Sequence, residues 1–124
     1  MSVTVDWCSS HIIHVNFENH WDWQEFSTGM QQAYTLMSKS AKTVNLMVDF
    51  VGSIKHVSTS ALANIIDKVE TPPNQGITVI VTEDALLGDK LSHILGQTNP
   101  NAAMIAVVSN GEEAINLIRN SVRV

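Results

Sequence analysis

A carboxylate and a run of hydroxyl side chains stand close together near the middle of the sequence. Asp49 ends an apolar stretch that begins at Val44, and Ser58, Thr59 and Ser60 follow after a short loop. This pattern predicts a buried strand and then the start of a helix. Because free N–H groups at a helix N-terminus attract negative charge, the hydroxyl residues beside Asp49 predict a site for an anion, or for a phosphate carried on Thr59 or Ser60.

The same hydroxyl residues also have a purely structural interpretation. Ser58 suits the N-cap position, where its side chain would accept a hydrogen bond from a first-turn amide and stabilise the helix by about 1 kcal/mol. Thr59 and Ser60 are mediocre helix formers that no capping role explains, although serine and threonine are common in first turns. Both interpretations stay open for this segment.

Asp49, Trp21 and Trp23 also have both a ligand-binding and a structural interpretation. Asp49 lies where open α/β sheets bind ligands, at the carboxyl end of a strand, but it could equally accept hydrogen bonds from the following loop. Trp21 and Trp23 flank Asp22 and could form a stacking platform in a pocket with Asp49. Their spacing favours structural roles, because Trp21 can staple onto Phe26 while Trp23 is in phase with the buried face of a helix.

The other residue types predict neither a metal site nor a catalytic centre. His11 and His14 fall on a predicted strand at a spacing that directs them to opposite faces, and no cysteine joins the five histidines at zinc-like spacing. Histidines scattered over the surface or along a sheet edge are the simpler interpretation. No phosphate-binding glycine motif and no nucleophile motif of the hydrolase type is present. We therefore expect a protein that is not an enzyme and carries no cofactor.

The elements that must position these residues follow from the periodicity. The order predicted is strand 3–7, strand 12–17, helix 22–40, strand 44–50, helix 58–69, strand 77–81, helix 84–96, strand 103–108 and a last helix from 109. Successive strand–helix units imply right-handed crossovers and parallel pairing. We expect an α/β fold with a mixed, mostly parallel sheet of four or five strands, edged by an N-terminal antiparallel hairpin.

Capping patterns predict where two of the helices begin. Asp22 can cap the first helix with Glu25 at its third position, and Ser109 with Glu112 forms a similar pair before the last helix. The helical phase also predicts three core residues, namely Trp23, Leu62 and Ile66.

Composition bounds the class of protein. A chain of 124 residues with a 44% hydrophobic fraction predicts one domain over residues 1–124. The net charge of −5, with few and scattered cations, argues against a nucleic-acid partner. Cys8 is the one cysteine, which favours a reducing compartment such as the cytoplasm. The longest apolar run, 102–108, is far shorter than the roughly 20 residues of a membrane helix, so we expect no membrane span.

The chain resembles the STAS family, the domain of bacterial anti-sigma factor antagonists. The family motif has a strand that ends in Asp and a helix that opens with Asp-Ser-Ser-Gly-Leu, and Asp49 and Ser58-Thr-Ser-Ala-Leu62 resemble these parts. Ser58 replaces the motif's Asp, and Ala61 replaces its Gly. The resemblance covers most of residues 11–120 and implies a STAS-like fold. It also implies Ser60 as a phosphoacceptor for a kinase that is itself the anti-sigma factor, with Thr59 at the neighbouring hydroxyl position.

The sequence supports two functional hypotheses from different classes. The leading hypothesis is a non-catalytic regulatory module that binds a protein partner, such as a kinase-type anti-sigma factor, through the surface around Asp49 and Ser58–Ser60. A phosphate there would add about two negative charges and disrupt the fit to an acidic or apolar partner. The alternative is a domain that binds a small apolar or anionic ligand such as a lipid, in a pocket with Trp21, Trp23 and Asp49. The pattern from Trp21 to Phe26 resembles a divergent STAS-like branch that is also compared with lipid-binding domains. A homodimer is compatible with either.

Overall fold

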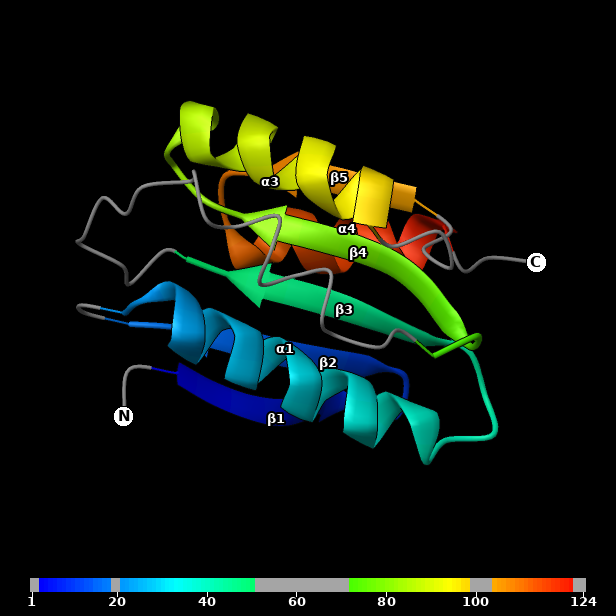
Figure 1. Cartoon of the computed structure of the whole chain (residues 1–124). Coiled ribbons are helices and arrows are strands. Elements are labelled where there is room, and N and C mark those ends of the chain that lie inside the picture. The colour runs from blue at the N-terminus through cyan, green and yellow to red at the C-terminus, as the bar shows by residue number, and fades with distance from the viewer. Residues whose placement is uncertain (1–2, 19–20, 51–71, 99–103, 122–124) are drawn as a thin grey trace.

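The computed structural model of the chain describes residues 3–18, 21–50, 72–98 and 104–121 (Figure 1). Its elements, in chain order, are β1 (Val3–Ser9), β2 (Ile12–Phe17), α1 (Trp23–Ser38), β3 (Val44–Asp49), β4 (Gln75–Val81), α3 (Ala85–Thr98), β5 (Met104–Val108) and α4 (Gly111–Ser121). The helix predicted at 58–69, with its core residues Leu62 and Ile66, lies outside the described residues.

The strands form one five-stranded sheet in the order β1-β2-β3-β4-β5. β1 and β2 pair in antiparallel fashion, and each later neighbour pairs in parallel. The predicted α/β fold with a mixed sheet and an N-terminal antiparallel hairpin is therefore confirmed. The parallel pairing of β3 and β4 agrees with their apolar sequences, because parallel strands are buried on both faces.

The described helices divide between the two faces of the sheet. α1 and α3 lie on one face and α4 on the other (Figure 1). Because the strand order advances in one direction across the sheet, right-handed crossovers place the connecting helices α1 and α3 on the same face. We call this the α1 face; it carries Val15 and Phe17. The opposite one, the α4 face, carries Met47 and Val79.

Aromatic side chains fill the α1 face at the carboxyl end of β2. The Phe17 ring lies 4.9 Å from that of Phe50 and 5.4 Å from that of Phe26, measured between centroids. Trp21 is 1% exposed and Trp23 is 9% exposed, and their rings meet edge to face at 4.8 Å. The predicted burial of Trp23 is confirmed.

The helix starts confirm one predicted cap and correct another. The Asp22 carboxylate accepts a 2.8 Å hydrogen bond from the Glu25 amide, as the spacing predicts. At α4, however, it is Asn110 Oδ1 that accepts from the Glu113 amide, at 2.9 Å, so the predicted cap at Ser109 is one residue too early. The Ser109 hydroxyl instead donates to the Glu113 carboxylate, at 3.2 Å.

The hairpin also differs in detail from its prediction. β1 continues to Ser9 with a register shift between Trp7 and Ser9, and His11 lies in the turn instead of on the strand. The buried Asn45 side chain of β3 then joins β4 and the hairpin turn, because its Oδ1 accepts from the Ile77 amide at 2.9 Å and its Nδ2 donates to the His11 carbonyl at 3.3 Å. These bonds help to hold β3 in register with β4 and with the turn that leads into β2.

Candidate functional site

A histidine and an aspartate from neighbouring parallel strands meet on the α4 face. Asn16 of β2 is the register partner of Asp49 of β3. His14 lies two residues before Asn16 on the same face of β2, so it is the diagonal neighbour of Asp49. His14 Nε2 and Asp49 Oδ2 are 3.0 Å apart. The imidazole side chain is 30% exposed and the carboxylate 15% exposed. A polar pair is therefore fixed in place but still reachable from solvent.

The surface around this pair is polar. On β1, Thr4 and Asp6 are exposed, and they are the antiparallel partners of Asn16 and His14. Directly opposed residues point to the same face, so all four side chains share the α4 face. Asn16 Nδ2 in turn donates a 2.9 Å hydrogen bond to Glu18 Oε1. We call this group of residues, with Asp49, the polar hairpin surface.

The position of α4 explains why this surface is open. α4 packs against β3, β4 and β5, whereas β1 and β2 receive α1 on their other face. Among the described elements, no helix packs to a comparable extent over the polar side of the hairpin. A partly exposed sheet face of this kind is compatible with antiparallel pairing, which tolerates water on one side.

The chemistry of the pair is that of oriented hydrogen bonding. A carboxylate that accepts from one ring nitrogen fixes the orientation of the imidazole and leaves the other nitrogen to bond outward. Within the described part of the chain, no hydroxyl or thiol hydrogen-bonds to His14, and no three His, Cys, Asp or Glu side chains gather closely enough to hold a metal ion. The arrangement can present donors, acceptors and negative charge to a partner.

The structure separates some of the residues that the sequence grouped together. Asp49 belongs to the α4 face, whereas Trp21 and Trp23 lie in the aromatic core of the α1 face. The described residues therefore do not bring the two tryptophans and Asp49 together in one pocket, and the tryptophans have the structural roles that their spacing favours. Ser58, Thr59 and Ser60 lie outside the described residues.

Sequence reasoning missed His14, which it treated as one of several scattered histidines. The alternation of Ile13, Val15 and Phe17 does predict that His14 and Asn16 share the opposite face. What the sequence does not supply is the register between β2 and β3, on which the contact with Asp49 depends. His11, by contrast, is exposed in the turn and contacts the neighbouring Ser10 hydroxyl.

Comparisons with known proteins do not assign the chain to a family. No family model matches the sequence, and neither the curated proteins nor the solved structures contain a significant match. In the described part of the chain, no helix combines the length and the apolarity that crossing a membrane requires.

Proposed function

We propose that this protein is a non-catalytic regulatory module that binds a protein partner through the polar hairpin surface around His14 and Asp49. The observation that carries the proposal is the 3.0 Å hydrogen bond between Asp49, at the carboxyl end of β3, and His14 of the neighbouring β2. Ligands of open α/β sheets bind at this end of the strands. A hydrogen-bonded pair costs less side-chain entropy on binding than two freely rotating side chains would.

The charges of the surface indicate the chemistry of the partner. Asp6, Glu18 and Asp49 supply carboxylates around a single imidazole. A partner that docks here would present hydrogen-bond donors or cations, since complementary charge selects the partner and speeds association.

The STAS resemblance extends this proposal to regulation. Asp49 would then precede a helix that opens with Ser58, Thr59 and Ser60, and an anti-sigma factor of the kinase type would be the partner. A phosphate on Thr59 or Ser60 would add about two negative charges beside Asp49 and alter the affinity for that partner.

Site-specific crosslinking tests where the partner binds. A photoreactive amino acid would replace Asn16, next to His14, and in a second strain it would replace Leu86, an exposed residue of α3. In cells of the native host, the Asn16 position should yield a discrete crosslinked protein that the Leu86 position does not. Equal products at both positions, or none at Asn16, would contradict the proposal.

Mass spectrometry of the untagged protein from the same cells addresses the alternative function. A phosphopeptide that contains Thr59 or Ser60 would support the regulatory extension. A stoichiometric lipid retained without any crosslinked partner would instead favour the ligand-binding domain.

A further inference from the structure

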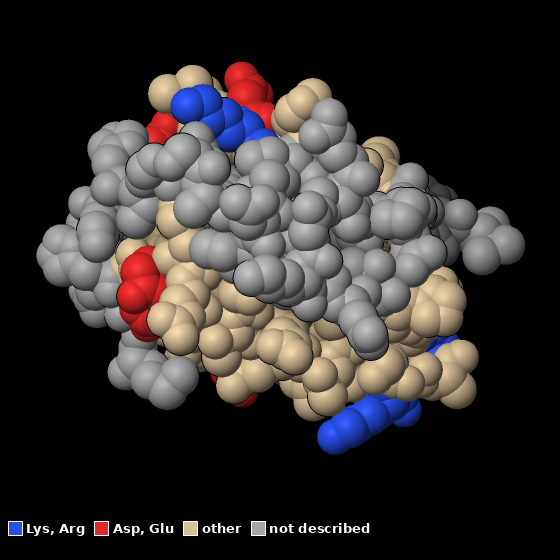
Figure 2. Space-filling view, in the orientation of Figure 1, with Lys and Arg blue, Asp and Glu red and all other residues tan. Residues whose placement is uncertain are grey.

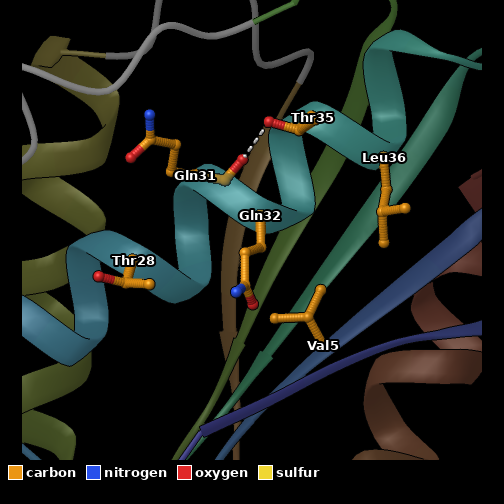
Figure 3. Close-up of a pocket in the computed structure, with 6 residues that line it drawn as sticks. All are labelled: Val5, Thr28, Gln31, Gln32, Thr35 and Leu36. Carbon is orange, nitrogen blue, oxygen red and sulfur yellow. Dashed lines mark hydrogen bonds between the residues drawn. The ribbon is translucent and has the colours of Figure 1, made fainter.

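Two hollows run along the line where α1 lies over β1, on the opposite side of the hairpin from His14. The larger, of about 470 Å³, is lined by Val5, Thr28, Gln31, Gln32, Thr35 and Leu36 (Figure 3). The second, of about 290 Å³, is lined by Val3, Asp22, Gln24, Glu25 and Thr28. Because Thr28 lines both, the two hollows are neighbours in one groove, which we call the β1–α1 seam.

The seam lies beside an available sheet edge. β1 is the first strand of the sheet, and among the described strands it pairs only with β2. The described strands therefore leave one row of its backbone N–H and C=O groups unpaired, and another strand could pair with this row. Val3 and Val5 are two residues apart on one face of β1, about 6.8 Å along the strand. Alternate side chains of an added strand have the same spacing, so they would enter the two hollows in turn.

The larger hollow is uncharged and has an apolar floor. Figure 3 shows Gln32 and Leu36 projecting from α1 toward Val5. The side chains of Val5 and Leu36 are half-buried. The Thr35 hydroxyl donates to the Gln31 carbonyl at 2.8 Å, while no described hydrogen bond engages the side-chain amides of Gln31 and Gln32. This hollow suits an apolar side chain and offers amide groups to an adjacent peptide backbone.

The smaller hollow is acidic. Two acidic residues, Asp22 and Glu25, line it together with Val3. Figure 2 shows acidic atoms on the left of the view, where α1 begins, and an uncharged surface along the middle of the helix. A lysine or arginine side chain complements this end of the seam. Trp7, which follows Val3 and Val5 on the same face of β1, is 41% exposed and gives a third, aromatic contact.

We propose that the β1–α1 seam binds an extended peptide of a partner protein, which adds a strand to the β1 edge and places a basic and an apolar side chain two positions apart. A second copy of this chain fits less well, because its β1, Val-Thr-Val-Asp-Trp-Cys-Ser, has no basic residue for the acidic hollow. The inference is independent of the proposed function, because His14 and Asp49 lie on the opposite face of the sheet.

Selection from a displayed peptide library tests the seam. The library would hold heptapeptides with threonine at the first, third, fifth and seventh positions and random residues between them. Selected peptides should carry Lys or Arg two positions from an apolar residue. The variant Glu25→Lys should weaken binding of a selected peptide about tenfold, since an attraction becomes a repulsion. Glu112→Lys, a matched change in the first turn of α4, should leave it unchanged.

Backbone methylation of a selected peptide tests the strand pairing itself. N-methylation at one set of alternate amides should abolish binding, whereas methylation of the other set should change it less than twofold, because only one set faces β1. The proposal is overturned if no sequence is enriched, if Glu25→Lys and Glu112→Lys weaken binding equally, or if both methylated sets bind alike. Sedimentation that shows a dimer blocked by Trp7→Lys would likewise overturn it in favour of a second copy.

Discussion

The two faces of β2 differ more sharply than any other pair of neighbouring surfaces in the hairpin. On the α1 face, Ile13, Val15 and Phe17 are all 0% exposed. On the α4 face, His14 and Asn16 are partly exposed and bond to acidic side chains. A single strand thus holds the core on one side and the candidate site on the other.

The difference shows how helix placement creates the site. α1 covers both strands of the hairpin, so apolar residues are required beneath it. α4 lies over β3 to β5, and on its face β2 changes from the buried Ile12 to the polar His14 and Asn16. Stability should therefore depend on the α1 face, and recognition on the polar hairpin surface.

The largest expected effect is on the covered face. Phe17→Ala removes a fully buried ring that contacts the rings of Trp21, Phe26 and Phe50, and it should lower the free energy of unfolding by about 3–5 kcal/mol. Asn16→Ala, one residue away on the other face, should cost about 0.5 kcal/mol, because its hydrogen bond is exposed. Urea denaturation measures both. Similar costs for the two variants would contradict the division between the faces.

The next effect concerns how closely α1 approaches the hairpin. A Cβ on Gly29 would lie 2.8 Å from Val3 Cγ2 and 3.5 Å from Val15 Cγ1, so Gly29→Ala should destabilise the protein by about 1–3 kcal/mol. Gly96 of α3 has nothing within 4 Å of its added Cβ, and Gly96→Ala should gain up to about 1 kcal/mol from helix propensity. Thermal melts should show opposite signs, and a stabilising Gly29→Ala would refute the close approach.

A smaller effect measures the bond at the candidate site. In a double-mutant cycle with His14→Ala and Asp49→Ala, the coupling free energy should be about 0.5–1 kcal/mol, since both groups retain contact with water. The cycle isolates this pair from the other contacts of Asp49. A cycle of His11→Ala with Asp49→Ala is the control and should show no coupling. A coupling near zero in the first cycle would mean that the pair does not form in solution.

Much of the fold could be predicted because its signals are local. The alternation in Ile12–Phe17 places each side chain on its face, and the spacing from Asp22 to Glu25 marks the start of α1. Where two local signals compete, as at Ser109 and Asn110, the residue pattern does not decide between them, and the structure has Asn110 as the cap.

The site was harder to predict because it depends on distant residues. His14 and Asp49 are 35 positions apart, and their contact requires the register of a parallel strand pair. Local periodicity does not fix that register, so the sequence identified Asp49 but not its partner. The seam had no signal at all in the sequence, since its residues on β1 and α1 are assembled only when the helix folds back over the hairpin. The STAS resemblance stays a prediction.

The affinity of the crosslinked partner shows whether binding depends on the His14–Asp49 pair. With that protein purified, isothermal calorimetry would compare wild type, His14→Ala and His11→Ala, after thermal melts have shown that the variants are folded. We expect that His14→Ala weakens binding at least about tenfold, as removal of a central contact does, and that His11→Ala leaves the Kd unchanged. Equal affinities for His14→Ala and wild type would contradict this expectation.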